Sequence, residues 1–330
     1  MGEFELIRRY FQRPQSPAGA VVLGIGDDCA LLEPSPGHQL AISSDMLVEG
    51  RHFFANVAPE ALGHKALAVN LSDLAAMGAR PLGFTLALAL PQADDAWLAA
   101  FAQGLFALAD AHACPLVGGD TTRGPLNLCV TVFGEVQPGR ALRRDAAQAG
   151  DDLYVSGRTG EARLALELMR GTDWAVAACG KEALTRQAGL RERLERPAPR
   201  NALGMALAAV DGAHATIDVS DGLAGDLDHI LQASGMGAEI ELAALPVAPA
   251  LRDLPEAQRL EYLLAGGDDY ELLFTAAPAA QAAVQAAAQA SQTPVTRIGR
   301  IKERPGLRLL DASGQTVSLT ARSFDHFVGD

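Results

Sequence analysis

Acidic residues beside glycines recur along this chain where short apolar runs end. The first case is Gly24-Ile25-Gly26-Asp27-Asp28, which follows the apolar run Val21-Val22-Leu23. Neighbouring carboxylates repel each other, and a positive charge between them relieves the repulsion. A hard cation such as Mg²⁺ suits this task because it takes oxygen ligands. Taken alone, the segment is better explained as an exposed turn, since Gly and Asp both favour turns.

The same arrangement of acids and glycines recurs further along the chain, which favours a metal-binding role over a simple turn. The later acids are Asp45, Asp120, Asp218 with Asp221, and Asp268 with Asp269. Strand ends of α/β sheets meet in one crevice, where ligands bind. Asp73 joins the set from a predicted helix, on whose face Asn70 also lies. Carboxylates gathered in one cleft need several divalent cations, and these in turn indicate a polyphosphate ligand.

A second glycine-rich stretch, Gly118-Gly119-Asp120-Thr121-Thr122-Arg123-Gly124, is suited to phosphate. Its backbone N–H groups can approach phosphate oxygens while Asp120 holds a metal ion. The lysine-bearing phosphate loop, the dinucleotide-binding glycine motif and the protein-kinase motifs are all absent from the sequence. ATP would therefore be held through carboxylates and Mg²⁺. Arg143 and Arg144 are candidate phosphate clamps, and for one of the two a solvated turn is the expected role.

Length, net charge and cysteine content limit the possible domain organisation, partners and compartment. The 330 residues predict two domains, which we place at 1–138 and 150–330, with a polar, basic junction between them. A formal net charge of -13 argues against nucleic acid or an anionic membrane as the main partner. The four cysteines show no C-x-x-C spacing, which indicates reduced thiols in a cytoplasm. Neither a secretory signal nor a membrane-spanning run is visible.

Apolar periodicity predicts mixed strands and helices in both halves, hence an α/β protein with helix-covered sheets. The first half is predicted to open with a short helix through Phe4 and Phe11. Its other elements are strands at 21–23, 30–32, 40–42, 82–90 and 126–136 and helices at 59–77 and 94–112. The second half is predicted to hold strands at 152–156, 215–217, 238–242, 272–275, 295–301 and 307–310 and helices at 161–169, 202–210, 223–233 and 279–290.

Three details of this prediction bear on the acids. The run 21–23 is predicted to be a buried strand, and the segment 43–45 is predicted to end the strand before it. A short buried strand at 116–117 is predicted to lead into the turn at 118–120. Residues 171–200 are predicted to be less regular.

The motifs in this order resemble the thiamine-monophosphate kinase family, within the aminoimidazole ribonucleotide synthetase-like superfamily. They are Gly24-Ile-Gly-Asp-Asp-Cys-Ala30, Ser43-Ser-Asp45, Asn70-Leu-Ser-Asp-Leu-Ala-Ala-Met-Gly78, Gly118-Gly-Asp-Thr-Thr-Arg-Gly124, Asp218-Val-Ser-Asp-Gly222 and Gly266-Gly-Asp-Asp-Tyr-Glu271. The likeness covers essentially the whole chain. It implies a two-domain fold whose N-terminal domain binds ATP and Mg²⁺ and pairs into a barrel in a homodimer. The C-terminal α/β domain would complete the active site.

The resemblance also implies roles for single residues. The metal ligands, direct or through water, would be Asp28, Ser43, Ser44, Asp45, Asp73, Asp120, Asp218 and Asp221. The ATP-binding residues would be Gly119, Asp120, Arg144 and Ser220, with Asp120 and Arg144 also catalytic. The contacts to thiamine monophosphate would come from His52, Asp268 and Phe324. The family usually has Glu at position 268, and often Tyr or Trp at position 324. Several Mg²⁺ ions are implied, and K⁺ is a further candidate.

The expected reaction is in-line transfer of the ATP γ-phosphoryl group to thiamine monophosphate, giving thiamine diphosphate and ADP. The acceptor is a phosphate monoester with a second pKa of about 6, so it needs no general base. Catalysis would then consist of positioning and charge neutralisation. Two alternatives stay open: an ATP-dependent synthetase of the same fold, and a non-catalytic protein that binds Mg-nucleotide.

Overall fold

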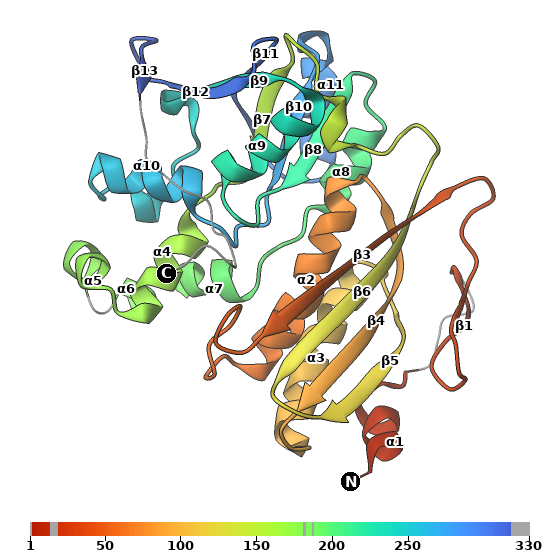
Figure 1. Cartoon of the computed structure of the whole chain (residues 1–330). Coiled ribbons are helices and arrows are strands. Elements are labelled where there is room, and N and C mark those ends of the chain that lie inside the picture. Colours follow the sequence, from red (N-terminus) through yellow and green to blue (C-terminus); the bar gives the residue numbers. More distant parts are fainter. Residues whose placement is uncertain (1, 14–18, 181–182, 187, 318–330) are drawn as a thin grey trace. The chain divides into compact units, whose positions relative to one another are not determined.

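The computed structural model describes residues 2–13, 19–180, 183–186 and 188–317, which fall into two compact units. Unit 1 comprises Met1–Leu74 and Ala79–Ala141, and unit 2 comprises Ala75–Gly78 and Leu142–Asp330. Each unit is built on its own sheet (Figure 1). Within the described ranges, no helix is long and apolar enough to cross a membrane.

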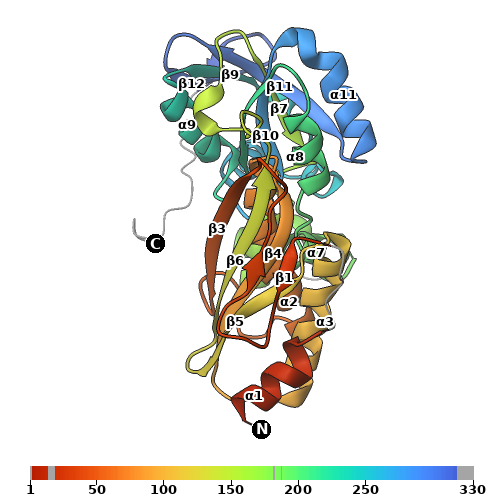
Figure 2. The same ribbon diagram turned by 90° about the vertical axis from the view of Figure 1, so that its right-hand side faces the viewer.

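Unit 1 is a four-stranded sheet with helices on one face. The strand order is β3-β6-β4-β5, antiparallel except for the parallel pair β4 and β5. The strands are β3 (Gln39–Val48), β4 (Arg80–Leu90), β5 (Leu116–Arg123) and β6 (Asn127–Val136). The helices α2 (Pro59–Ala76) and α3 (Asp95–Ala111) lie against one face of the sheet, as Figures 1 and 2 show from two directions. A short α1 (Glu3–Leu6) with η1 (Ile7–Phe11) and a hairpin of β1 (Val21–Leu23) and β2 (Leu31–Leu32) complete the unit.

The two helices pack closely because glycines allow it. A Cβ at Gly104 on α3 would lie 1.8 Å from the carbonyl oxygen of Glu60 on α2. The Asp94 side chain caps α3 by accepting the Trp97 N–H at 2.7 Å. Leucines along both helices, such as Leu67 and Leu105, are fully buried between helix and sheet. This close packing against the sheet holds in place the helix residues whose side chains face β3.

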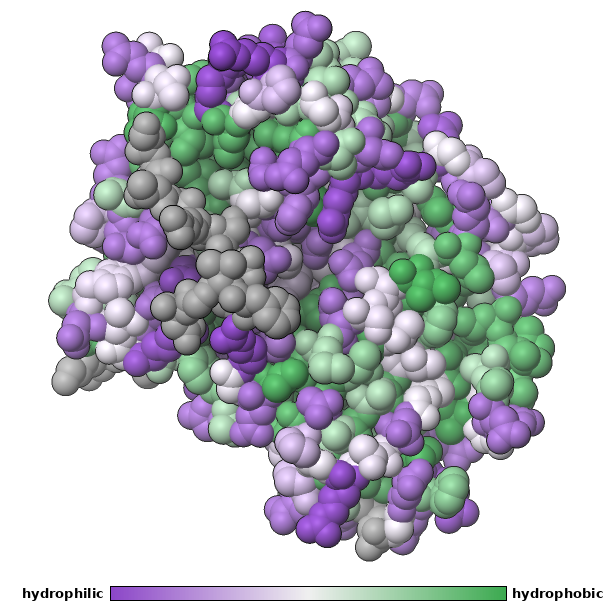
Figure 3. Space-filling model, in the orientation of Figure 1, coloured by the Kyte–Doolittle hydropathy of each residue, from purple (hydrophilic) through white to green (hydrophobic). Residues whose placement is uncertain are grey.

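The other face of the same sheet is open and apolar. On β3, Leu40, Ile42 and Met46 alternate with more buried residues and are 52%, 61% and 56% exposed. The hairpin adds Val22 and Leu31, which are also more than half exposed. Figure 3 shows hydrophobic surface over the strands of this sheet. Exposed apolar surface of this kind is typical of an interface.

Unit 2 is a seven-stranded mixed sheet in the order β13-β12-β9-β11-β7-β10-β8. Its strands are β7 (Asp152–Ser156), β8 (Ala213–Asp218), β9 (Gly237–Glu241), β10 (Leu272–Ala276), β11 (Val295–Lys302), β12 (Gly306–Leu310) and β13 (Thr316–Val317). Its helices are α4 (Glu161–Arg170), α5 (Asp173–Cys179), α6 (Ala183–Arg186), α7 (Ala188–Glu195), α8 (Asn201–Ala208), α9 (Leu223–Ser234), α10 (Glu256–Ala265) and α11 (Gln281–Ala290). Short 3-10 turns are η2 (Arg144–Ala146), η3 (Leu242–Ala244), η4 (Pro249–Leu251) and η5 (Pro278–Ala280).

Two apolar cores hold this sheet between helices. Alternate residues of β10 point to opposite faces, so Leu273 enters one core while Leu272 and Phe274 enter the other. The first core contains residues of α4 and α9, and the second contains residues of α8 and α11. On the second face, the rings of Tyr154 and Phe274 stack with centroids 5.2 Å apart. The acidic motifs of unit 2 lie at one end of this sheet, at the end of β8 and before the start of β10.

The predicted α/β class and most predicted elements are confirmed, with five corrections. Strand β3 runs on through 43–45, and β5 runs through 118–123, so Asp45 and Asp120 lie inside strands. Strand β1 is not buried in the single chain. The helix α10 was not predicted. Part of the stretch 171–200 is helical, in α5, α6 and α7.

Candidate active site

In unit 1, the β3 strand and the helix α2 join the first group of predicted metal ligands. The Ser43 hydroxyl donates a hydrogen bond of 2.5 Å to the Asp73 carboxylate. Two residues along the strand, the Asp45 N–H donates to the Asn70 side-chain oxygen at 3.0 Å. The predicted shared helix face of Asn70 and Asp73 is therefore confirmed, and that face meets β3.

Ser44 lies on the opposite face of the sheet from Ser43, because side chains alternate along a strand. Its hydroxyl is 2.9 Å from the Thr131 hydroxyl on β6. The strand register continues this row to Thr85 on β4, and two residues further along β4 pairs Ala87 with Asp120 on β5. Asp120 is exposed. The predicted ligands of unit 1 are thus divided between two faces of one sheet.

Gly119 is required by the path of β5. Its φ is +143°, and a Cβ there would lie 1.9 Å from the carbonyl oxygen of Leu86 on the neighbouring strand. Only glycine tolerates this approach, so the position of Asp120 at the sheet edge depends on the residue before it.

Two further predicted residues of unit 1 lie in turns. After β1, the Asp27 carboxylate accepts the Asp28 N–H at 2.8 Å, and both acids are exposed. After β3, the His52 ring accepts the Val48 N–H at its Nδ1 atom, 3.0 Å away. The neutral ring therefore carries its proton on Nε2.

The predicted acids do not converge into a ready-made cage. In the parts of the chain that the structure describes, no three His, Cys, Asp or Glu side chains lie close enough together to hold a metal ion. This arrangement still fits Mg²⁺, which usually binds one or two carboxylates and takes its other ligands from water and substrate phosphates. The donors that unit 1 offers are all hard oxygens, from Asp and Ser.

In unit 2, a buried carboxylate shapes the loop that carries Asp218, Ser220 and Asp221. Asp218 ends β8 and is buried. The Asp226 Oδ2 atom, on the first turn of α9, accepts the backbone N–H groups of residues 220, 221 and 222 at 3.0, 3.1 and 3.2 Å. Burial raises the pKa of Asp226 to about 7, although these three N–H donors act in the opposite direction.

The segment Gly266–Glu271 lies along this loop and is joined to it through the backbone. The Asp268 N–H donates to the Ser220 carbonyl at 2.8 Å, and the Tyr270 N–H donates to the Val219 carbonyl at the same distance. A Cβ at Gly267 would lie 2.4 Å from the Ser220 carbonyl oxygen. The two predicted binding segments of unit 2 are therefore one connected piece.

The two candidate arginines differ in their partners. The Arg143 guanidinium binds Asp145 through Nε at 2.8 Å and Nη2 at 2.5 Å. Arg144, in η2, is exposed, and its carbonyl accepts the Ser234 hydroxyl at 2.8 Å. Arg143 is thus occupied by its own turn, and Arg144 is the better candidate for phosphate.

Three points separate the structure from the sequence predictions. Asp45 and Asp120 lie inside strands and do not follow strand ends. The buried acids Asp226 and Glu271 were not among the predicted site residues, although Asp226 had a readable signal as an acid in the first turn of a helix. Phe324 lies outside the described residues.

Comparison with known proteins agrees with the motifs. The family model for the AIR synthase related protein N-terminal domain matches residues 26–136, and that for the C-terminal domain matches residues 148–312. Thiamine-monophosphate kinase of Escherichia coli K12 is 45% identical over 328 residues, which cover 99% of this chain and 98% of the relative.

Solved structures give the same result. The crystal structure of thiamine-monophosphate kinase from Stenotrophomonas maltophilia K279a has a TM-score of 0.82 and 47% identity and covers 91% of this chain and 93% of the other. A structure of AaThiL complexed with AMPPCP and TMP has a TM-score of 0.75 and 30% identity, with 89% of each chain covered. Because the matches extend through both domains and nearly the whole length, this chain belongs to the thiamine-monophosphate kinase family.

Proposed function

We propose that this chain is an ATP-dependent kinase that phosphorylates thiamine monophosphate, giving thiamine diphosphate and ADP. The observation that carries the proposal is the identity of 45% to thiamine-monophosphate kinase of Escherichia coli along essentially the whole chain. AMPPCP, named with TMP in the related structure, is an ATP analogue whose β–γ bridge is carbon, so it cannot give up its γ-phosphoryl group. A nucleotide and an acceptor bound together support direct transfer.

In the transfer, an oxygen of the acceptor's phosphate forms a new bond to the γ-phosphorus while the bond from that phosphorus to the β–γ bridging oxygen breaks. ADP leaves with the electron pair of that bond. The acceptor phosphate has a second pKa of about 6, so it is largely ionised at neutral pH and no side chain has to remove a proton. The protein's task is positioning and charge stabilisation.

The metal role is assigned to the oxygen donors of both units. We propose that Asp28, Ser43, Ser44, Asp45, Asp73, Asp120, Asp218 and Asp221 hold Mg²⁺ directly or through water. Bound Mg²⁺ would neutralise phosphate charge that builds up during transfer. Ser43 and Ser44 lie on opposite faces of one strand, which favours more than one ion. No observation supports a K⁺ site, and K⁺ stays a prediction.

The residues that we assign to nucleotide and acceptor binding are those that the family motifs imply. Gly119, Asp120, Arg144 and Ser220 would bind ATP, with the Arg144 guanidinium on phosphate oxygens. His52 and Asp268 would contact thiamine monophosphate. The Phe324 contact to thiamine monophosphate stays a prediction. We assign ATP and Mg²⁺ binding and subunit pairing to the domain at 1–138, and acceptor recognition with further metal ligands to the domain at 150–330.

The open sheet face supports a homodimer. Leu40, Ile42 and Met46 would be costly to expose on a monomer, and four strands with one bare apolar face can close against a second copy. We propose that two copies pair through this face into a barrel. A cytoplasmic location is likewise a proposal, supported by the four free cysteines, which suit a reducing compartment.

One assay separates the proposal from its alternatives. The purified chain is given ATP, Mg²⁺ and thiamine monophosphate, and the products are identified by mass. Thiamine diphosphate with an equal amount of ADP supports the kinase. Binding of Mg-nucleotide without ADP release would point to the non-catalytic protein. ADP formed only with an amide or formyl acceptor would point to the synthetase.

A further inference from the structure

The segment Gly266–Glu271 holds an unusual backbone. Asp268 has φ of +66° and Tyr270 has φ of +50°, and they are two of the four non-glycine residues with positive φ in the described parts of the chain. Residues with a Cβ avoid this left-handed region unless the surroundings enforce it. Something must therefore hold this segment in place.

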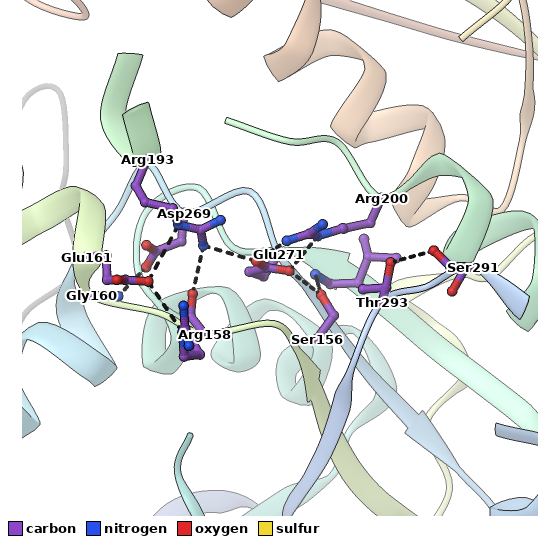
Figure 4. A network of polar contacts seen from close by, with 11 residues as sticks. Ser156, Arg158, Gly160, Glu161, Arg193, Arg200, Asp269, Glu271, Ser291 and Thr293 are labelled. Atoms are coloured by element: carbon purple, nitrogen blue, oxygen red, sulfur yellow. Dashed lines mark hydrogen bonds and ion pairs between the residues drawn. The ribbon is translucent and has the colours of Figure 1, made fainter. Parts of the chain in front are cut away.

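Glu271, at the end of the segment, is the first anchor (Figure 4). Its carboxylate is fully buried and accepts two hydrogen bonds from Arg200, through Nε at 2.7 Å and Nη2 at 2.5 Å. Arg193 Nη2 adds a contact of 3.0 Å, and the Ser156 hydroxyl donates at 2.6 Å. Burial alone would raise the pKa of Glu271, but the two arginines and Ser156 lower it, so the group stays charged at neutral pH.

The surroundings are shaped to this carboxylate. Gly157 has φ of +51°, and a Cβ there would lie 2.1 Å from the Glu271 Oε1 atom, so both the backbone conformation and the space beside the carboxylate favour glycine. The arginines come from α7 and from the residue directly before α8. Glu271 thus ties two helices and the end of β7 to the start of β10.

Asp269 is the second anchor. Its Oδ2 atom accepts the Gly160 N–H at 2.6 Å, at the beginning of α4. Both anchors are buried, whereas Asp268 and Tyr270 are partly exposed. The segment therefore fixes itself through residues 269 and 271 and presents residues 268 and 270.

From this alternation we infer that Glu271 is a positioning residue for the reaction. Its arginine pair holds the left-handed backbone at residues 268 and 270, which places Asp268 for the acceptor. The backbone hydrogen bonds from Asp268 and Tyr270 to the carbonyls of residues 220 and 219 hold Ser220 in place in the same way. The inference rests on the proposed function, because it gives Asp268 the acceptor as its ligand.

The test compares two buried glutamates that each accept hydrogen bonds from arginine and from a serine hydroxyl. Glu271→Gln keeps shape and removes charge. Glu135→Gln is the matched control, since Glu135 in unit 1 also accepts from an arginine, Arg80, and from a serine hydroxyl, Ser35 at 2.8 Å. We expect Glu271→Gln to raise KM for thiamine monophosphate on the order of ten-fold, since small misplacements of binding groups are costly. Glu135→Gln should leave that KM unchanged.

Arg200→Lys gives a second variant that keeps the charge and loses the two-point contact, so an intermediate rise in KM is expected. If Glu271→Gln does not fold, Arg200→Lys is the variant that tests the inference. Unchanged KM values in both folded variants, or the same loss of kcat in Glu271→Gln and Glu135→Gln with no rise in KM, would overturn the inference.

A second readout is independent of turnover. Amide hydrogen exchange on the free chain should be faster at Asp268 and Tyr270 in Glu271→Gln than in the wild type, and unaltered there in Glu135→Gln. If the wild type makes no thiamine diphosphate, the proposed function fails while this measurement still decides whether Glu271 holds the segment. Unchanged exchange at both amides would show that it does not.

Discussion

The hydroxyl of Ser43 and the carboxylate of Asp73 are joined by a hydrogen bond of 2.5 Å, which links β3 to α2. The bond holds the Asp73 Oδ2 atom at the strand. Because both residues are proposed metal ligands, this pair makes the metal role of unit 1 testable at a defined contact.

Asp73→Asn should raise the Mg²⁺ concentration needed for half-maximal activity on the order of ten-fold or more, because an amide binds Mg²⁺ more weakly than a carboxylate and donates hydrogen bonds that a metal cannot use. Ser43→Ala should have a smaller effect, since the carboxylate remains. Magnesium titrations of initial rate measure both. An unchanged requirement in a folded Asp73→Asn protein would remove Asp73 from the metal ligands.

Asp120→Ala should be the most damaging single change, with kcat lower on the order of a hundred-fold even at saturating Mg²⁺, because Asp120 is proposed to serve metal and nucleotide together. Asp95→Asn is the control. Asp95 is also an exposed acid of unit 1, and its ion pair with Arg9 at 3.2 Å is a surface contact of little energetic weight. Near-normal turnover of Asp120→Ala would contradict the metal-cluster interpretation.

The sequence was sufficient for the elements with strong apolar periodicity, and less so where polar residues interrupt a strand. Strand β3 continues through Ser43, Ser44 and Asp45 because β6 supplies ladder partners along its whole length. This tertiary support outweighs the weak strand preference of Ser and Asp. Helix α10 did carry a signal that the prediction missed, with an acid at its first position, Glu256, and apolar residues at 260, 263 and 264.

In the candidate site too, some residues could be recognised from the sequence and others could not. Motif acids such as Asp218 and Asp268 were recognised from glycines and spacing. The role of Glu271 was not visible, because its partners Arg200, Arg193 and Ser156 are 71, 78 and 115 residues away in the chain. No local pattern relates residues at such distances, so a buried charge network becomes apparent only once the chain is folded.

Ile42→Lys should convert the proposed homodimer into a monomer, since it places a charge on the exposed apolar sheet face, where Ile42 is 61% exposed in the single chain. Molar mass by light scattering on a sizing column measures this. Met205→Lys is the control, because Met205 is an exposed apolar residue on α8 of unit 2 and should leave the mass unchanged. A wild-type mass of one chain would contradict the pairing itself.

Cys114 should be inert toward thiol reagents in the folded protein, whereas Cys29 should react. Cys29 is exposed, and Cys114 is fully buried after the end of α3, where burial raises the pKa of its thiol to about 12. At pH 8 the thiolate fraction of Cys114 is on the order of one in ten thousand. Cys29→Ser should remove the fast phase of a colorimetric thiol titration, and Cys114→Ser should leave it intact. A fast phase lost in Cys114→Ser would disprove this burial.

The ion pair between the buried Glu135 and the exposed Arg80 predicts a pH dependence of stability. Burial alone would raise the pKa of Glu135, but hydrogen bonds from Ser35 and Arg80 lower it below its usual value near 4.5. Its stabilising contribution is therefore fully present above the usual value and is lost as the pH falls through the lowered pKa of the folded state. Glu135→Gln should lower the free energy of unfolding at pH 7 by about 1–3 kcal/mol. Below pH 4 the difference between variant and wild type should shrink, because the wild-type carboxylate loses its charge there. Denaturant unfolding at a series of pH values measures this, and a difference that stays constant from pH 7 to pH 3 would contradict the assignment of the charge to Glu135.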